Sequence, residues 1–382
     1  MELHDFDDIR PYLPEELPGV YERLFSDKEF CAVLGFILPG IPLEMIRAKM
    51  LSCKTNLEFQ KVFCYTFLEQ LLQKASTGIT FDAEAVDLSK RYTFISNHRD
   101  IVLDSAFLDK LLVDAGCDTT CEIAIGDNLL SRPWVRDLVG VNKAFIVRRS
   151  LPRLQLMRAS IQLSEYMHFV INQKNDNVWI AQREGRAKDS NDRTQIAILK
   201  MMTLGGEGTI IDRLLQLHLV PLSISYEYDP CDYLKAREFQ LRRDIEGWKK
   251  TAEDDVLSMK TGILGWKGKI HYHCAPCIDD YLKSLPVDMP KNELYERIAI
   301  HIDHEIHAHY RLFPNNYIAL DMLNGETSFS DCYTYEEKTT FDKYLEGQLA
   351  KITDVTNKDE AFLRECLLTM YANPTVNYLT AK

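Results

Sequence analysis

The sequence lacks several features that would assign it to a particular class of protein. It has no internal repeat, no Pro/Gly-rich tract typical of disorder, and no apolar run near the ~20 residues that a membrane-spanning helix needs. It also lacks the basic excess of a nucleic-acid-binding chain, because its formal net charge is −12. With 382 residues, 46% apolar and 27% charged, it has the composition of a soluble globular protein with one large domain and an accessory one.

A secretory signal is missing too, since the first residues, M-E-L-H-D-F-D-D, are acidic where a signal peptide is basic. The ten cysteines are scattered along the chain, which indicates free thiols in a reducing cytoplasm. The longest apolar stretch, Phe30–Leu38, is ended by Pro39, Gly40 and Pro42. We interpret it as a buried core segment, with contact at a membrane interface as the alternative.

Three regions follow from the pattern of apolar residues: an N-terminal helical region (1–85), an α/β domain (86–312) and a C-terminal helical extension (313–382). The polar segment Ala75–Lys90 is expected to join the first two. Predicted strands are Tyr92–Ser96, Cys121–Ile125, Ala144–Val147, Val178–Ala181, Val220–Ser225 and Lys269–Cys274. Predicted helices are Glu58–Gln73, Asp104–Val113, Leu154–Asn172, Gln195–Met202, Cys231–Gly247, Asn292–His309 and Tyr335–Leu367. This alternation predicts an α/β fold with a central mixed, largely parallel sheet flanked by helices.

Residues 95–104 read I-S-N-H-R-D-I-V-L-D and are the most informative segment. A strand ends at Asn97, and Asp100 is a candidate N-cap of the next helix, so His98 stands at a strand-to-helix corner, where open α/β sheets bind substrates. Asp100 and Asp104 share one helical face; one would cap the helix while the other orients the imidazole. A carboxylate on one ring nitrogen leaves the other free to accept a proton, so the segment predicts a general base. A simple loop hydrogen bond beside a helix cap is the alternative.

Three later strand ends carry charged or polar side chains. The first ends in Arg148 and Arg149, which face opposite ways, and an arginine fork suits phosphate. The second runs into Q-R-E-G-R-A-K, where Gly185 permits a tight turn between Glu184 and Arg186 and the cations cradle an anion. The third ends in the Tyr-Glu pair of V-P-L-S-I-S-Y-E-Y-D. Together with His98, these strand ends predict one site.

The order of these four blocks resembles the glycerol-phosphate and lysophosphatidic-acid acyltransferase family over roughly residues 90–230. The matching residues are Asn97-His98 with Asp104, Phe145-Ile146 with Arg148-Arg149, Glu184-Gly185-Arg186, and Val220-Pro221 with Tyr226-Glu227. The resemblance implies that a fatty acyl chain moves from acyl-CoA or acyl carrier protein to a hydroxyl of a phosphorylated glycerol lipid precursor, in membrane phospholipid synthesis. It also implies that His98 is the active histidine, that Asp104 is its partner, and that arginines of the second and third blocks bind phosphate. We expect no metal and no other cofactor.

Two one-residue departures from the family pattern suggest a distinct branch. The family has four residues between His and Asp, whereas five separate His98 from Asp104, so either the corner bulges or Asp100 is the partner. The family has one residue between Gly and Arg in the third block, whereas Arg186 follows Gly185 directly. Arg186 or Lys188 is therefore the expected anion contact.

The expected mechanism has His98 remove the proton of the acceptor hydroxyl, while Lys143 or a backbone N–H near the corner stabilises the carbonyl oxygen. Arg149, Arg186 or both would hold the anionic group of the acceptor. Lipid products and the lack of a spanning segment suggest a cytoplasmic protein, peripheral on the inner face of the membrane, with no nucleic-acid partner. The alternatives are acylation of another lipid, such as an amino-acid-containing one, and a non-catalytic membrane-docked lipid-binding protein.

Two histidine-containing segments are weak metal candidates. In H-Y-H-C-A-P-C, Cys274 and Cys277 have the spacing of a zinc pair, but strand alternation would place His271 and His273 on the face opposite Cys274. The H-E-I-H within residues 301–309 is one residue short of a metalloprotease helix. We predict a solvated or helix-capping histidine face there.

Overall fold

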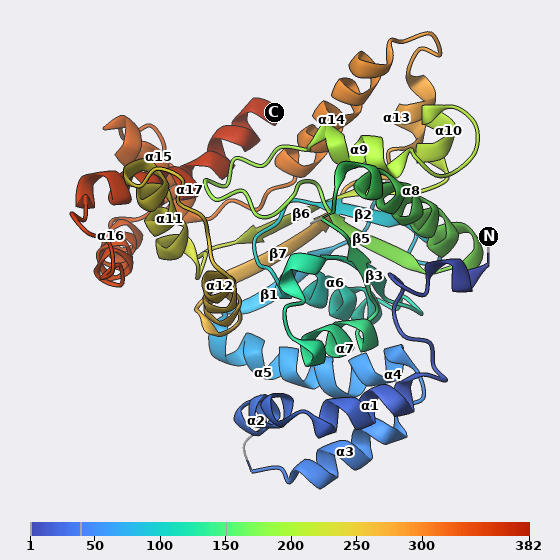
Figure 1. The fold of residues 1–382 in the computed structure, drawn as a ribbon. Helices are drawn as coiled ribbons and strands as arrows, with labels where there is room; N and C mark the ends of the chain where they lie inside the picture. Colours follow the sequence, from blue (N-terminus) through green and yellow to red (C-terminus); the bar gives the residue numbers. More distant parts are fainter. Residues whose placement is uncertain (1, 39, 150) are drawn as a thin grey trace.

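A computed structural model describes residues 2–38, 40–149 and 151–382. Its centre is a seven-stranded sheet in the order β1-β7-β6-β2-β5-β3-β4, with helices on both faces (Figure 1). The strands are β1 (Gly78–Asp82), β2 (Thr93–Ser96), β3 (Cys121–Gly126), β4 (Ala144–Val147), β5 (Asn177–Ala181), β6 (Leu219–Tyr226) and β7 (Lys269–Cys274). The predicted α/β fold and all six predicted strands are confirmed.

The sheet is mixed but largely parallel, as predicted. β6, β2, β5, β3 and β4 pair in parallel, whereas β7 runs antiparallel to β6 and parallel to β1. The carboxyl ends of the five parallel strands therefore share one edge of the sheet, which we call the carboxyl edge. β1 and β7 end at the opposite edge, the amino edge.

Alternation along the strands divides the core between the two faces. Ile95 points into one apolar cluster and its neighbour Phe94 into the other. The first face is covered by α8 (Arg153–Phe169), α9 (Ile196–Met202), α10 (Ile210–Leu215), α13 (Asp279–Ser284) and α14 (Lys291–Ala308). The second is covered by α5 (Tyr65–Ala75) and α6 (Leu103–Asp114), with α7 (Pro133–Val141) beside them.

The N-terminal helices form a further layer beneath the second face (Figure 1). They are α1 (Leu17–Ser26), α2 (Lys28–Ile37), α3 (Leu43–Ser52) and α4 (Asn56–Phe59). Asp27 caps α2 by accepting hydrogen bonds from the amides of Glu29 and Phe30. Phe30, the first residue of the apolar stretch Phe30–Leu38, is 2% exposed and packs in the core of this layer. The buried-core interpretation therefore holds at Phe30, while Pro39 lies outside the described residues.

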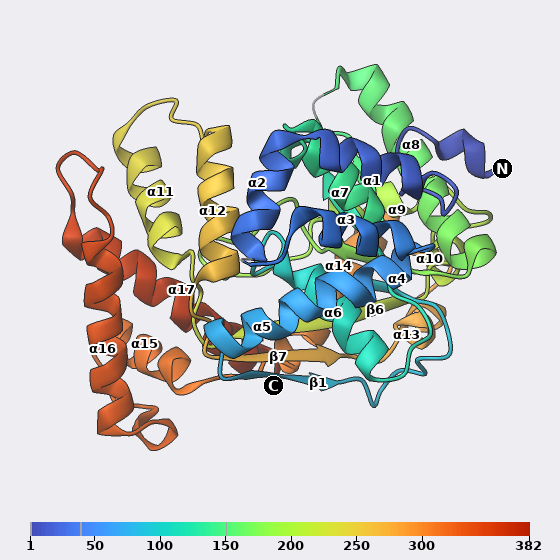
Figure 2. The same cartoon turned by 90° about the horizontal axis from the view of Figure 1, so that it is seen from below.

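The C-terminal helices gather at one end of the molecule (Figure 2). They are α11 (Asp232–Asp244), α12 (Ala252–Leu264), α15 (Pro314–Asn324), α16 (Tyr335–Ala350) and α17 (Glu360–Ala381). All but α12 share a separate apolar core. Within the described residues, no helix combines the length and the apolar character that crossing a bilayer requires.

Three sequence predictions differ from the structure. The segment Ala75–Lys90 contains β1, so the predicted boundary at residue 85 cuts a strand away from its sheet. β1 escaped prediction because it is a half-exposed edge strand that pairs only with β7. The predicted helix Tyr335–Leu367 is two helices, and the turn between them holds Asn357 in the left-handed region (φ 54°). The predicted helix Glu58–Gln73 contains a π-helical turn at Gln60–Cys64.

Candidate active site

The corner between β2 and α6 holds His98 at the carboxyl edge. Its predecessor Asn97 is fully buried and braces the corner against β6. The Asn97 side chain donates to the backbone oxygen of Ile224 (2.9 Å) and accepts from the Ile224 amide (2.8 Å). This pair of hydrogen bonds satisfies backbone groups that the end of β2 would otherwise leave unpaired.

The imidazole of His98 is bonded to Asp104 in the first turn of α6. The distance from His98 Nδ1 to Asp104 Oδ2 is 2.7 Å, and the His98 side chain is 12% exposed. The ring of Trp179 on β5 packs edge-on against the imidazole, with the ring centres 5.7 Å apart. An ionised carboxylate only accepts hydrogen bonds, so Nδ1 carries the proton and Nε2 is left with a lone pair. The arrangement suits a general base acting through Nε2.

Asp104 is held as firmly as the imidazole that it orients. The side chain is fully buried, and Oδ2 also accepts from the amides of Arg99 (2.6 Å) and Asp100 (3.0 Å). Its other oxygen accepts from the Tyr226 hydroxyl at 3.2 Å. Together with His98, these donors fix the orientation of the carboxylate.

Asp100 has the capping role in this corner. Its Oδ1 accepts from the amides of Val102 and Leu103, both at 2.8 Å, ahead of the first turn of α6. Its other oxygen faces Gly262 on α12, where an added Cβ would lie 2.0 Å away. Burial, and after it the charge of Asp104, raises the pKa of Asp100. Of the two alternatives, the structure thus places Asp104 on the imidazole and Asp100 on the helix.

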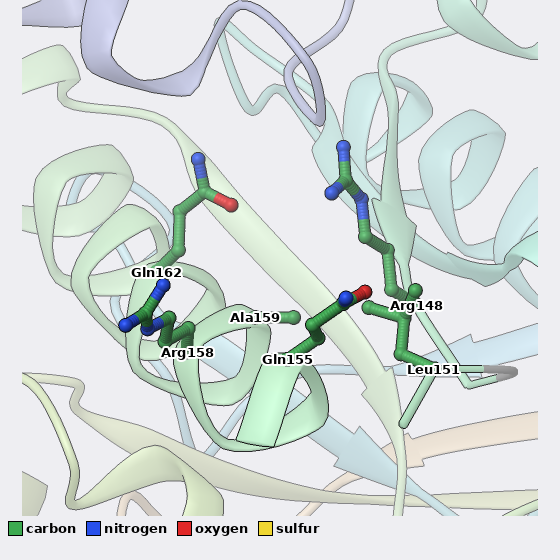
Figure 3. Close-up of a pocket in the computed structure, with 6 residues that line it drawn as sticks. All are labelled: Arg148, Leu151, Gln155, Arg158, Ala159 and Gln162. Atoms are coloured by element: carbon green, nitrogen blue, oxygen red, sulfur yellow. The ribbon is translucent and has the colours of Figure 1, made fainter. Parts of the chain in front are cut away.

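The arginine pair after β4 splits between the two faces of the sheet. Arg149 reaches back toward β5 and meets Glu184 at 3.4 Å, with a third of its side chain exposed. Arg148 pairs with Asp8 at 2.5 Å and lines a surface hollow of about 410 Å³ beside α8 (Figure 3). Both arginines lie at the carboxyl edge, but only Arg149 is directed toward β5, because successive strand residues face opposite ways.

The loop after β5 brings the third block beside the His98 corner, since β5 pairs with β2. Gly185 has φ 66°, the left-handed turn that the sequence predicts, and Glu184 is exposed. Arg183 Nε and Arg186 Nη1 are buried, and neither has an acceptor among the described residues. Burial alone would lower the pKa of Arg186, but nearby acidic groups raise it, Asp100 among them. Two guanidinium groups, each with one buried nitrogen that has no acceptor among the described residues, thus lie in the loop that follows the strand next to β2.

Two predicted site residues lie elsewhere. The Lys188 ammonium is bonded to Glu238 on α11, which directs it toward the C-terminal helices. Lys143 precedes β4, so it lies at the amino edge, where its ammonium donates to Asp176 (2.9 Å) and to the Thr120 oxygen (3.2 Å). The prediction that Lys143 stabilises a carbonyl oxygen beside His98 is therefore wrong, because the two residues flank opposite ends of parallel strands.

Several contacts of the site escaped the sequence prediction. The sequence pattern assigns Trp179 to a strand and, by alternation, to the face of β5 opposite its neighbour Ile180, but not to the site. Tyr272 on β7 donates to the backbone oxygen of Asp104 at 3.0 Å, a contact that depends on tertiary structure. Lys267, almost fully buried, ends α12 by donating to the oxygens of Ile263 (3.0 Å) and Gly265 (2.7 Å). Burial lowers the pKa of Lys267 to about 8.

Comparisons with known proteins add little to this geometry. No protein-family model and no curated protein matches the chain. Among solved structures, the chain is similar to the crystal structure of the 1-acyl-sn-glycerophosphate (LPA) acyltransferase PlsC from Thermotoga maritima. The two are 12% identical with a TM-score of 0.37, over 78% of this chain and 100% of that chain. A TM-score this low does not establish a common fold, so function has to be inferred from the site itself.

Proposed function

We propose that this protein is an O-acyltransferase that moves a fatty acyl chain from a thioester, acyl-CoA or acyl carrier protein, to a hydroxyl of an anionic glycerol-phosphate-type acceptor. The observation that carries the proposal is the His98–Asp104 pair, held at the carboxyl edge beside the unused guanidinium donors of Arg183 and Arg186. The order of the four sequence blocks supports the same reaction. A general base next to anion-binding groups is what such a transfer requires.

In the proposed reaction His98 Nε2 takes the proton of the acceptor hydroxyl while the oxygen attacks the thioester carbonyl. Negative charge on the carbonyl oxygen is stabilised by a donor near the corner. The C–S bond then breaks, and the thiolate recovers the proton from His98. Asp104 remains a carboxylate and stabilises the imidazolium. General-base catalysis by the His98–Asp104 pair is expected to raise the rate about 10²–10⁴-fold.

Arg149 is proposed to bind the anionic group of an extended acceptor. β4 lies three strand spacings from β2, roughly 14 Å, and the Arg149 side chain reaches part of the way back. Its partner Glu184 is exposed, and an exposed ion pair of this kind contributes at most about 1 kcal/mol. A phosphate can therefore displace Glu184 at little cost.

Apolar side chains near the site support a peripheral position on a membrane, which we propose to be its inner, cytoplasmic face. Val256, Leu257 and Leu264 on α12 and Trp266 after it are each about half exposed. α12 contacts the catalytic corner through Gly262 and Asp100. Lipid acceptors would reach His98 most directly from a membrane that covers this surface. Vesicle flotation of Trp266→Ser, which should bind phospholipid more weakly than wild type, tests this part.

The test of the reaction is thiol release from a long-chain acyl-CoA, with and without glycerol-3-phosphate or its 1-acyl derivative. His98→Ala should lose activity, whereas His304→Ala, an exposed histidine on α14, should not. Arg149→Ala should raise the KM for the acceptor, whereas Arg148→Ala, its neighbour on the other face, should leave it unchanged. Full activity in His98→Ala would overturn the mechanism.

The outcomes also separate the acceptors. Release that depends on a phosphorylated acceptor supports the glycerol-phosphate assignment. Thiol release that depends on neither acceptor but is lost in His98→Ala supports the role of His98 in thioester cleavage. It favours another lipid as the acceptor, such as an amino-acid-containing one. The structural observation that favours this second candidate is the ion pair between Lys188 and Glu238, because it occupies a cation that the sequence assigned to the acceptor's phosphate. No release with either acyl-CoA or acyl carrier protein as donor would leave a lipid-binding role.

A further inference from the structure

Three metal-ligating side chains meet at the amino edge, away from His98. They are His218, directly before β6, Cys277, in the turn between β7 and α13, and Asp279, the first residue of α13. Antiparallel pairing of β6 with β7 brings the two segments together, and the Ile278 amide extends it by donating to the Leu219 oxygen at 3.0 Å. α10, which precedes β6, and α13, which follows β7, lie side by side (Figure 1).

Packing of the intervening residue aims two of the three side chains. Ile278 is 2% exposed and belongs to the apolar core of the first face. Ile278 is also the N-cap of α13 (φ −79°, ψ 9°), so burial of its side chain fixes the turn that places Cys277 and Asp279 beside His218. One donor atom from each of the three residues lies within 4.8 Å of the others.

Two features of this cluster are unexplained by its internal hydrogen bonds. Asp279 Oδ2 accepts from His218 Nδ1 at 2.7 Å, but Asp279 Oδ1 is buried and has no donor among the described residues. His218 has φ 47°, a left-handed conformation that is uncommon for a residue other than glycine. A buried carboxylate oxygen without a donor costs about 1–3 kcal/mol or more, and strained backbone tends to occur at functional sites.

We propose that His218, Cys277 and Asp279 bind a single zinc ion. Imidazole nitrogen, thiolate sulfur and carboxylate oxygen together form a donor set that zinc accepts and that Mg²⁺ and Ca²⁺, which prefer oxygen, do not. The ion satisfies the free oxygen of Asp279. All three side chains are partly exposed, so water has access to the fourth tetrahedral position.

The geometry requires only small side-chain movements. Zinc bonds of about 2.0–2.3 Å in a tetrahedron separate ligand atoms by roughly 3.3–3.6 Å. One donor atom of each residue already lies within 4.8 Å of the others, so the widest separation closes by about 1 Å, while the 2.7 Å hydrogen bond between His218 Nδ1 and Asp279 Oδ2 gives way to zinc coordination. Rotation about the side-chain bonds of partly exposed residues can supply both changes.

This site differs from the zinc pair that the sequence suggested and from the expectation of no metal. Cys274 is fully buried in the core of the second face, while His271 bonds to Thr80 and His273 pairs with Asp82. Strand alternation thus separates those residues as predicted. Cys277 lies beyond the strand and takes its partners from a different segment.

The experiment is a Co²⁺ titration of the full chain, stripped with a chelator and desalted, followed by absorption spectroscopy. Wild type should bind one equivalent with a thiolate-to-cobalt charge-transfer band and the visible bands of a tetrahedral ion, and Zn²⁺ should displace it. Cys277→Ser should lose the charge-transfer band. Asp279→Asn should weaken Co²⁺ affinity at least about tenfold, since even an outer-shell change costs 10–100-fold. Cys332→Ser, an exposed cysteine after α15, is the matched control and should behave as wild type.

Thermal unfolding supplies a second measurement. Zn²⁺ should raise the Tm of wild type and of Cys332→Ser but not that of Cys277→Ser, and circular dichroism confirms that each variant is folded. The proposal is overturned if wild type shows no saturable charge-transfer band, or if the band survives in Cys277→Ser. Because none of these measurements depends on acyl transfer, their outcome is independent of the proposed function.

Discussion

Asp104→Asn isolates the charge of the proposed dyad from its geometry. Asp104 Oδ2 accepts from two backbone amides as well as from His98, so an amide NH₂ group in that position would face three donors. The asparagine oxygen therefore takes the place of Oδ2, and its NH₂ group faces Tyr226, whose hydroxyl can accept as well as donate. The orientation and tautomer of His98 are preserved. Only the negative charge is lost.

The size of the effect follows from Coulomb's law. Two unit charges about 4 Å apart at an effective dielectric of about 20 interact by about 4 kcal/mol, which sets the upper limit. That corresponds to about 10³ in rate, so we expect kcat to fall about 10²–10³-fold with little change in KM. Asp104→Ala, by contrast, also leaves buried donors without an acceptor, each costing about 1–3 kcal/mol of folding stability.

Thiol release at saturating acceptor measures kcat, and urea unfolding measures the stability of each variant. In a His98→Ala background, Asp104→Asn should slow the residual reaction no further, because residues that act as one unit are not additive. Wild-type kcat in Asp104→Asn would refute the role of the charge. An equal loss in the His98→Ala background would show that Asp104 acts through something other than His98.

Three further predictions concern the surroundings of the site. Lys143→Met should leave kcat and KM unchanged, because Lys143 lies at the amino edge, yet urea unfolding should show a loss of about 2 kcal/mol from its hydrogen bonds. Gly262→Ala should destabilise by about 1–3 kcal/mol and lower kcat at least tenfold, since its Cβ displaces Asp100 from the helix cap. Burial raises the pKa of Asp109 to about 7. The folded state thus binds an extra proton between about pH 4 and 7, and the stability advantage of Asp109→Asn should grow with pH across that window, by at most about 4 kcal/mol.

Two of these predictions have a matched control, and each of the three has an outcome that would contradict it. Gly347→Ala on α16 adds a methyl group to open space and should stabilise by about 0.5–1 kcal/mol. Asp280→Asn at a fully exposed position should leave the pH dependence of stability unchanged. A kcat defect in Lys143→Met, wild-type kcat in Gly262→Ala, or a pH-independent difference between Asp109→Asn and wild type would each contradict the structural account.

Much of the fold was predictable because the sheet is buried and regular. Runs such as Ala144–Val147 and Lys269–Cys274 have the same limits in the prediction and in the structure. β1 was not predicted, since a half-exposed edge strand carries a weak apolar signal. The position of Lys143 could have been predicted: it precedes its strand, whereas Arg148 and Arg149 follow theirs, so they lie at opposite edges of a parallel sheet.

By itself, the sequence determined the local arrangement: strands alternating with helices, His98 at a strand-to-helix corner, and Arg148 and Arg149 facing opposite ways. These features depend on periodicity and on neighbours along the chain. Tertiary structure alone decided that Asp104 rather than Asp100 meets the imidazole, because Asp104 lies in the first turn of α6 whereas Asp100 lies in the corner before that helix, and the path of the corner sets their distances to His98. It also decided that His218 meets Cys277, since antiparallel strand pairing joins segments that no local pattern relates.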